Sequence, residues 1–461
     1  MYNPNQLISA AFLVLLLVVT ACGSKKTSIP AAPSPADIPV NLSTDIVINY
    51  RLDKAGLRDT FNRAIDDALK GNFDIPDYDI KMTLSKARPA TVEIEGKNLL
   101  VVVPVTVNLE KSTFLADLKA KGTMEMNFIT DVDIDSVWNV KTATSLSYHR
   151  WIEKPKLSVG AINIPIQTIS DIALSKTKYL IEQGINESVN SNMDVKQKMK
   201  ENMKMFDQPM RFDTSISAWL NIKPEKFFIN KVKNSKLYAE GKVSIKGTST
   251  FSTYKPQAFA VSKNLPRVYW NESIPDSSVF RLSADIKTSD INPVLKANLD
   301  GKTFTTGDKS ITLSNIITNC DYEFLRVITD VQGAANGTLV IKGKPVYDKV
   351  ANGFRMENID IQFKTKNVLH KAAAWIAEGK IRQELEEKLT FNINETIRDV
   401  QKSIDNQLAD FNKKYNLDMK LGLGSVGVES FKLRPGQIEA IMVSRFYLEV
   451  GIRDLRSFNR F

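Results

Sequence analysis

Cysteine and histidine are scarce in this chain, with only two residues of each type among 461. Zinc sites and most nucleophilic or acid–base sites depend on these side chains, and His149 and His370 lie far apart with no second ligand nearby. Cys22 and Cys320 could form one disulfide at most, so a disulfide-stapled fold is excluded. We predict no catalytic residue, no metal and no cofactor, and expect Cys320 to be a buried, inert thiol.

The motifs of common enzymes are also missing. The chain contains no GxSxG, Walker or HExxH sequence. The run Gly422–Gly427 has the spacing of a dinucleotide fingerprint, but that fingerprint must follow a strand and open a helix. Here a predicted helix precedes it and strand-like residues follow. We therefore interpret Gly422–Gly427 as a glycine-rich turn from helix to strand.

Three aspartates at alternate positions resemble the start of a calcium-binding loop. They are Asp131, Asp133 and Asp135. The glycine that such a loop requires is replaced by Ser136, and the bidentate glutamate is replaced by Thr142. Alternation predicts that the three carboxylates share one solvated face of a strand, and a non-standard cation site is the alternative.

A short apolar segment is the clearest targeting signal. Residues Met1–Ala21 carry no charge, and the ten residues Ala10–Val19 are all apolar. A membrane-spanning helix needs about 20 apolar residues, so this length fits the core of a signal peptide. The sequence Val19-Thr20-Ala21-Cys22-Gly23 resembles the bacterial lipobox. We predict a signal peptide at 1–21 and lipidation of Cys22, with a plain signal peptide or anchor as the alternative.

The residues after Cys22 indicate a tether. From Gly23 to Pro39 the chain is polar and contains four prolines, a composition typical of a semi-rigid linker. Gly23 occupies the position where an aspartate could retain a lipoprotein in an inner membrane, and no acidic run indicates surface display. We predict a flexible linker at 22–39 and a periplasm-facing location on the outer membrane, with surface display as the alternative.

The net charge is positive. Lys and Arg number 62 and Asp and Glu 52, which gives a formal charge of +10. This charge would suggest nucleic acid as a partner in a cytosolic protein, but the predicted export removes that partner. The first of the two long predicted helices contains four lysines that could contact anionic lipid headgroups: Lys196, Lys198, Lys200 and Lys204. Their spacing distributes them around the helix, which favours an ordinary solvated surface.

Two long proline-free segments have the apolar period of a helix, Ile166–Phe206 and Asn367–Asn412. In the first segment the apolar residues are Ile185, Val189, Met193, Met199, Met203 and Phe206. In the second they are Ile381, Leu385, Leu389, Ile393, Ile397, Val400, Ile404, Leu408 and Phe411. Ile185, Val189 and Met193 correspond to Ile381, Leu385 and Leu389 at a constant offset of 196 residues. Their slowly rotating stripes favour a helix wrapped by a twisted sheet over a coiled coil.

Strand-like alternation flanks each predicted helix. After the two long helices, apolar and polar residues alternate at Lys236–Gly247 and at Gln437–Gly451. Near the start of each half, a strand-like segment, Ile46–Tyr50 or Ser283–Ile286, precedes a short predicted helix. The repeated order predicts an α+β fold of two tandem modules, each a long α-helix wrapped by a curved, mostly antiparallel β-sheet. The predicted boundaries are 40–260 for the first module and 261–461 for the second.

Several short motifs resemble a family of bacterial envelope lipoproteins. They are Tyr148-His149-Arg150-Trp151, Pro155, Leu157, Gly160–Ile164, Ile38-Pro39-Val40 and the Gly-Thr pairs that begin at Gly122 and Gly337. The family is known as domain of unknown function 4403, and the resemblance implies no established reaction. Its architecture is similar to the tubular lipid-binding (TULIP) superfamily, in which a long helix lies in a curved sheet beside an apolar groove.

The resemblance implies that a membrane-anchored lipoprotein binds or transfers a lipid or another amphiphile in an apolar groove. The candidate groove residues are Ile185, Val189, Met193, Met199, Met203, Ile381, Leu385, Leu389, Ile393 and Ile397. Ordinary core packing is the alternative role for the methionines. Two other functions stay open: a scaffolding lipoprotein that binds protein partners without a ligand, and an enzyme that uses a pair of carboxylates.

Overall fold

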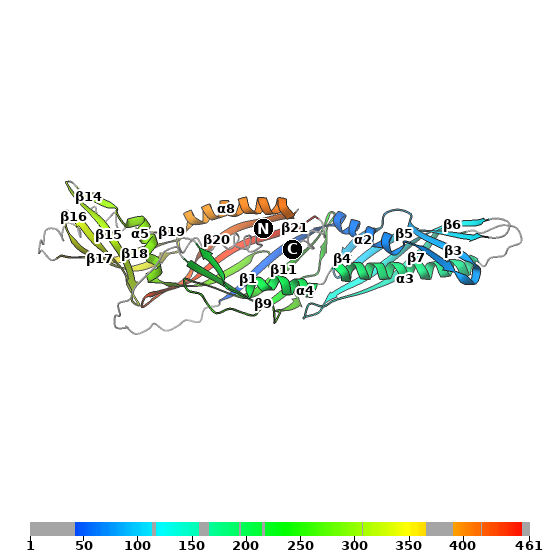
Figure 1. Ribbon diagram of the computed structural model, residues 1–461, viewed down its shortest axis with the longest axis horizontal. Coiled ribbons are helices and arrows are strands. Elements are labelled where there is room, and N and C mark those ends of the chain that lie inside the picture. The colour runs from blue at the N-terminus through cyan, green and yellow to red at the C-terminus, as the bar shows by residue number, and fades with distance from the viewer. Residues whose placement is uncertain are drawn as a thin grey trace.

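Most of the described residues belong to three β-sheets, which lie in a row along an elongated molecule (Figure 1). The computed structural model describes residues 42–112, 117–155, 166–192, 195–213, 217–306, 308–365, 391–415 and 417–453. The first end sheet contains β2 (Asn72–Ile75), β3 (Ile80–Lys86), β4 (Thr91–Glu95), β5 (Asn98–Ser112), β6 (Asp117–Ile134) and β7 (Val140–Glu153). The second end sheet contains β14 (Thr303–Thr306), β15 (Lys309–Cys320), β16 (Leu325–Gly333), β17 (Gly337–Asp348), β18 (Gly353–Lys364) and β19 (Phe391–Asn392).

The central sheet has nine strands. They are β1 (Ser43–Asp53), β8 (Met210–Asp213), β9 (Ser217–Ile229), β10 (Lys233–Asn234), β11 (Tyr238–Ser252), β12 (Arg267–Trp270), β13 (Ser278–Lys287), β20 (Leu417–Arg434) and β21 (Gln437–Ile452). Most neighbouring strands in the three sheets are antiparallel, as predicted. The four predicted strand segments are confirmed as β1, β11, β13 and β21, except that Lys236 and Leu237 precede β11.

The central sheet takes strands from both predicted modules, because the boundary between residues 260 and 261 falls between β11 and β12. β1 pairs with β11 along its whole length and also runs parallel to the end of β21. Where β1, β11 and β13 diverge, buried hydroxyl groups replace the missing backbone partners. Thr44 Oγ1 accepts from Arg281 N at 3.0 Å, and Ser278 Oγ accepts from Val47 N at 2.8 Å.

The described helices are α2 (Lys54–Ala68), α3 (Ile166–Asn192), α4 (Val195–Met203), α5 (Asn292–Leu299) and α8 (Ile393–Tyr415), with 3₁₀ turns η1 (Pro76–Tyr78), η2 (Lys204–Phe206) and η3 (Thr288–Ile291). The short helix predicted after β1 is confirmed as α2, which buries Leu57, Phe61 and Ile65. None of the helices in the described ranges combines the length and the apolarity needed to cross a membrane.

The two predicted long helices need correction. The first is divided into α3 and α4, which pack in different hydrophobic clusters. Val189 is the last predicted stripe residue within α3, and Met199 and Met203 belong to α4, so the described parts of the stripe lie on two separate helices. Within the second predicted helix, Phe391 and Asn392 instead form β19, which pairs with β18, and α8 starts at Ile393. The part of this prediction at 366–390 lies outside the described residues.

Candidate functional site

The inner face of α3 is closely packed against the first end sheet. Six of its buried residues recur at every fourth position: Ile169, Ala173, Thr177, Ile181, Ile185 and Val189. The apolar members belong to one core with Met124, Met126 and Phe128 of β6. Ile185 is fully buried and Val189 is 4% exposed. These two predicted groove residues therefore lie in the core beneath the sheet.

A glycine allows α3 to approach α2. A Cβ atom on Gly184 would come within 2.6 Å of the Ala68 Cβ atom, a distance that real side chains do not reach. The two helices can pack side by side only because this position lacks a side chain. The glycine that precedes the apolar series in the sequence is thus a packing residue of α3.

The outer face of α3 borders a groove with a volume of about 520 Å³. Its described lining consists of Thr168, Asp171, Ile172, Ser175, Lys176 and Tyr179. These residues extend over about 16 Å of helix, and the groove is shallow and largely open to solvent. Their positions were not predicted from the sequence, because the buried series has the stronger periodic signal.

The groove combines apolar and charged side chains. Ile172 is half-buried, whereas the Tyr179 side chain is 59% exposed and offers an apolar ring to a bound molecule. Asp171 and Lys176 supply opposite charges, and the Lys176 ammonium lies 5.2 Å from the ring centroid of Phe73 in β2. This arrangement suits an amphiphile, because a hydrocarbon chain and a charged head group both find matching side chains.

Polar side chains of α3 cover part of the outer edge of β7. Glu182 Oε1 accepts a hydrogen bond from Leu146 N at 2.9 Å, and Asn186 Oδ1 accepts from the hydroxyl of Thr144 at 2.7 Å. β7 is the last strand of its sheet, so these groups occupy the place of a missing strand. The helix thereby shields this part of the edge.

Helix α8 does the same for the outer edge of β20, along which it lies in Figure 1. The Gln401 side chain accepts from Leu423 N at 3.2 Å and donates to Leu421 O at 3.3 Å. Three turns later, the Asn412 side chain accepts from Met419 N at 2.8 Å and donates to Met419 O at 3.0 Å. Each amide reproduces the donor–acceptor pair of a neighbouring strand.

The methionines of α4 pack at the junction between the first end sheet and the central sheet. Met203 is 5% exposed and belongs to a cluster with Phe227 and Val268, and the partly buried Met199 packs against the same cluster. Met199 and Met203 therefore have the surroundings of ordinary core residues, which was the alternative to a role in the groove. The residue that completes the cluster is Trp138, from the turn between β6 and β7.

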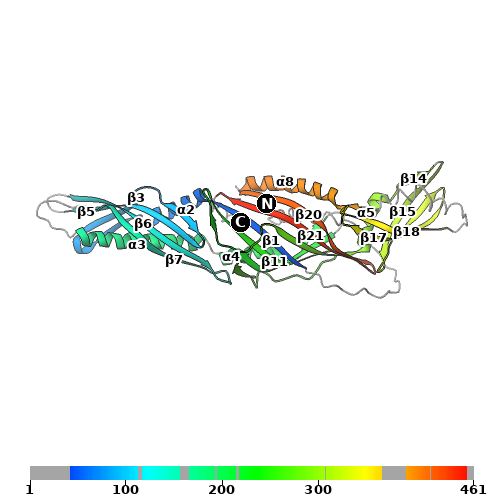
Figure 2. The ribbon, with the colours of Figure 1, turned by 180° about the vertical axis from the view of Figure 1, so that it is seen from behind.

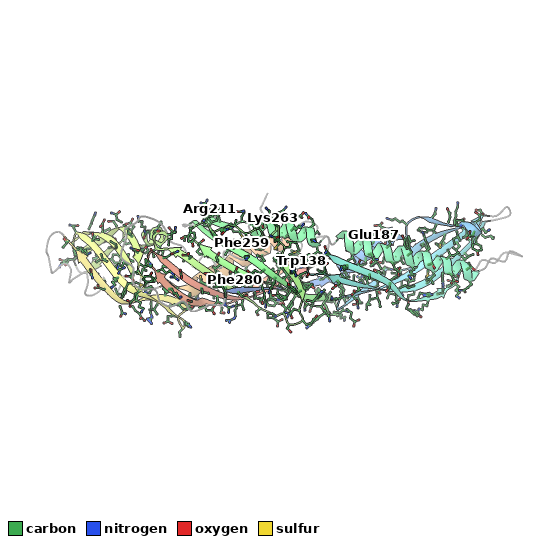
Figure 3. The ribbon with its side chains drawn as sticks, turned by 90° about the horizontal axis from the view of Figure 1, so that it is seen from below. Trp138, Glu187, Arg211, Phe259, Lys263 and Phe280 are labelled. Atoms are coloured by element: carbon green, nitrogen blue, oxygen red, sulfur yellow. The ribbon has the colours of Figure 1, made fainter. Side chains whose placement is uncertain are left out.

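Trp138 links the two sheets (Figure 3). Its indole Nε1 donates to Pro266 O at 2.7 Å, and its ring meets Phe227 edge-on with centroids 5.1 Å apart. Its backbone φ of 70° lies in the left-handed region, where a bulky residue is strained. The buried ring and its hydrogen bond hold the turn in this conformation.

The aspartates before Trp138 shape this turn. Asp135 Oδ1 accepts from Val137 N and Asn139 N, both at 3.0 Å, and the hydrogen bonds from the Asn139 side chain and backbone lower the pKa of Asp135. Asp135 lies beyond the end of β6, so the predicted three-carboxylate strand face is wrong at this position. Sequence alternation could not show that the strand ends at Ile134.

Asp133 forms an ion pair within the first end sheet and accepts a hydrogen bond across the same junction. Its Oδ1 atom accepts from Lys97 Nζ at 2.5 Å and from the Trp270 indole at 3.1 Å, and the bond from Lys97 lowers the pKa of Asp133. The Lys97 ammonium also lies 4.1 Å from the Trp270 ring centroid. Within the described part of the chain, no group of three His, Cys, Asp or Glu residues is arranged to hold a metal ion.

The glycine-rich run forms part of a strand and not the predicted turn. Gly422–Gly427 lies inside β20 and pairs with β21, with a register irregularity between Leu423 and Val426. The helix-to-strand change comes earlier, between Tyr415 and Leu417. Glycines are tolerated in a strand where the pairing is irregular, and the predicted turn at this position is therefore wrong.

The remaining predicted positions divide into described and undescribed residues. His149 is exposed on β7 opposite Met126, and Trp151 of the same motif packs against the core of the first end sheet. Outside the described residues lie Cys22, Met193, His370, Ile381, Leu385 and Leu389. Ile393 and Ile397 belong to α8, but their side chains are not among those described.

Cys320 is buried, as expected, at 4% exposure. Its thiol lies 2.9 Å from Arg434 O and 3.3 Å from Gln437 O, and burial raises the pKa of the thiol. We predict that the folded protein reacts with a thiol-specific maleimide at pH 7 at least 100-fold more slowly than the unfolded chain, because the reactive thiolate is both rare and shielded. Rapid labelling of native protein at Cys320 would contradict this placement.

These features define an elongated, mostly antiparallel β protein in which helices shield parts of sheet edges and one helix borders a groove. A family model described as Domain of unknown function (DUF4403) matches residues 43–450, so the chain belongs to this family. The resemblance found from the sequence motifs is confirmed. No curated protein sequence matches the chain.

Three solved structures are similar to this chain at low identity. The crystal structure of lipopolysaccharide binding protein is 11% identical, with a TM-score of 0.28, over 89% of this chain and 99% of that one. P47 of Clostridium botulinum E1 is 10% identical, with a TM-score of 0.20, over 86% and 98% of the two chains. P47 from Clostridium botulinum A2 is 11% identical, with a TM-score of 0.20, over 86% and 97%. At these TM-scores, none of the three supports a statement about function.

Proposed function

We propose that the protein binds or transfers a lipid or another amphiphile, and that the groove on the outer face of α3 is its binding site. The groove itself is the observation that carries the proposal: apolar Ile172 and the Tyr179 ring lie on the same helix face as the charged Asp171 and Lys176. We further propose the TULIP-like architecture, with α3 and α8 as the corresponding long helices of two tandem modules. Their matching roles at the edges of β7 and β20 support this correspondence.

The proposed location is the periplasmic face of the outer membrane. Support comes from the lipobox-like residues that end at Cys22 and from the polar linker that follows. Nineteen residues lie between Cys22 and Leu42, the first described residue, and a proline-rich chain of that length can reach about 60 Å when extended. A lipid anchor at Cys22 would let the folded body contact the membrane surface without crossing it.

A bulky substitution in the groove tests the proposed binding site. We expect Ser175→Trp to weaken binding of a fluorescent fatty acid at least tenfold, because the indole would occupy the space between Ile172 and Tyr179. Gln183→Trp is the matched control, since Gln183 is also exposed on α3 but does not line the groove. Equal binding by both variants and the unmodified chain would place the site elsewhere.

The scaffolding function is the second candidate, and the packed core beneath α3 favours it. Ile181 and Ile185 are fully buried, so the described interior of the first end sheet leaves them no contact with a ligand. Native mass spectrometry of the purified chain separates the two functions. A co-purified amphiphile that Ser175→Trp removes supports lipid binding, whereas one stoichiometric protein partner without amphiphile supports a scaffold.

A further inference from the structure

The positive charge of the chain is concentrated in one segment. Residues Val195–Trp270 contain fifteen Lys and Arg residues and five Asp and Glu residues, so this segment accounts for the entire formal charge of +10. The segment forms α4 and the strands β8 to β12 at one side of the central sheet. A field of one sign over such a limited area attracts anionic partners.

Three of these cations form a row across neighbouring strands. Arg267 of β12 is opposite Lys226 of β9, and Lys226 is opposite Lys246 of β11. Residues opposite one another point to the same face of a sheet, and all three side chains are exposed. Like charges in this arrangement destabilise a sheet, so folding alone does not account for the row.

Aromatic side chains lie beside the cationic row. Tyr269 and Phe228 are opposite each other, two positions along from Arg267 and Lys226, so they share the same face. Their ring centroids are 5.8 Å apart, and the Lys246 ammonium lies 5.2 Å from the Phe228 centroid. Tyr269 is 38% exposed. We call Arg267, Lys226, Lys246, Phe228 and Tyr269 the basic–aromatic face.

Intramolecular acids neutralise little of this charge. Lys246 has Asp45 of β1 at 3.6 Å as its acidic partner. Across the described ranges, neither Lys226 nor Arg267 forms an ion pair with an acidic side chain. The two cations at the outer side of the row are therefore available to an external anion.

We infer that the basic–aromatic face docks on a membrane surface that contains anionic phospholipid. A row of cations on one sheet face matches a layer of phosphate groups, and tyrosine is favoured at the boundary between head groups and acyl chains. β1 begins beside this face, because Asp45 lies opposite Lys246. A tether that precedes β1 therefore joins the same sheet, and lipid anchoring and surface docking would act together.

Vesicle binding by the chain from Gly23 onward tests the inference, since this chain retains every described residue and lacks Cys22. Two kinds of vesicle are compared: phosphatidylcholine with about 30% phosphatidylglycerol, which has an anionic surface, and phosphatidylcholine alone, which has no net charge. Each cation near an anionic surface contributes about a fivefold factor in partitioning. We expect Lys226→Gln, Lys246→Gln and Arg267→Gln together to weaken binding to the anionic vesicles about 100-fold.

The matched control combines Lys302→Gln, Lys349→Gln and Lys364→Gln. These lysines are exposed in or near the second end sheet, and their replacement changes the net charge by the same amount. We expect the control to weaken binding less than threefold. Equal losses in the two triple variants, no preference of the unmodified chain for anionic vesicles, or binding to a sulfated polysaccharide in place of vesicles would each overturn the inference. Fatty-acid binding by the α3 groove is measured separately, so failure of one proposal leaves the other testable.

Discussion

Replacing Trp138 with alanine is expected to lower the free energy of unfolding by about 3–5 kcal/mol. The substitution removes the largest side chain of the cluster at the junction, together with the hydrogen bond to Pro266 and the edge-on contact with Phe227. The cavity that remains is bordered by parts of two sheets, so partial collapse cannot fill it easily. Chemical denaturation monitored by far-UV circular dichroism, which does not depend on the tryptophan signal, would measure the change in the free energy of unfolding.

The neighbouring residue provides the control for this variant. Val137 belongs to the same turn but is 45% exposed, so Val137→Ala should change the free energy of unfolding by less than about 0.5 kcal/mol. Hydrogen exchange gives an independent readout. In Trp138→Ala, faster exchange should begin at the segments around Asp133 and Val268, which meet at the junction. A variant as stable as the unmodified protein would show that the two sheets associate without this side chain.

Replacing Ile185 with alanine is expected to cost about 2–5 kcal/mol and to leave amphiphile binding unchanged. Ile185 is fully buried on the inner face of α3, where it packs in the core with the strands of the first end sheet. Ile172→Ala is the comparison on the outer face of the same helix, with a smaller stability loss and weaker binding. Thermal unfolding and fluorescent fatty-acid titration of both variants would separate the roles of the two faces.

The opposite pattern would be informative. If Ile185→Ala weakened fatty-acid binding at unchanged stability, the ligand would enter the core between α3 and the sheet, as the sequence analysis suggested. The groove on the outer face would then lose its role. A stability loss of several kcal/mol in Ile172→Ala would likewise contradict its position on the groove side of the helix.

Local patterns in the sequence were sufficient to find individual elements. Leu57, Phe61 and Ile65 recur every four residues, and all three are buried in α2. The alternation at Gln437–Gly451 corresponds to β21 almost residue by residue. In both cases one face of a single helix or strand packs against the core, and the spacing of apolar residues is enough to predict this.

Long-range relations were not accessible in this way. The pairing of Asn49–Leu52 with Glu449–Ile452 joins the two ends of the described chain, and no local period encodes it. The hydrophobic character of Trp138 gave no indication that it packs against strands of another sheet. Gly422–Gly427 was misassigned for a related reason, because its strand character depends on pairing with β21. The groove residues of α3 form a mixed polar set, which periodicity does not select.

The position of β1 in the central sheet has a consequence for the order of folding. β1 needs β11, about 200 residues later, and the end of β21, about 400 residues later, before its edges are satisfied. Contacts of such high sequence separation form slowly, since a long loop must close before they contribute stability. A chain emerging from a ribosome or a translocation channel can complete its end sheets early, but β1 must wait for the last strand. During that interval its open edges favour aggregation, and a chaperone that shields extended segments would be expected to raise the yield.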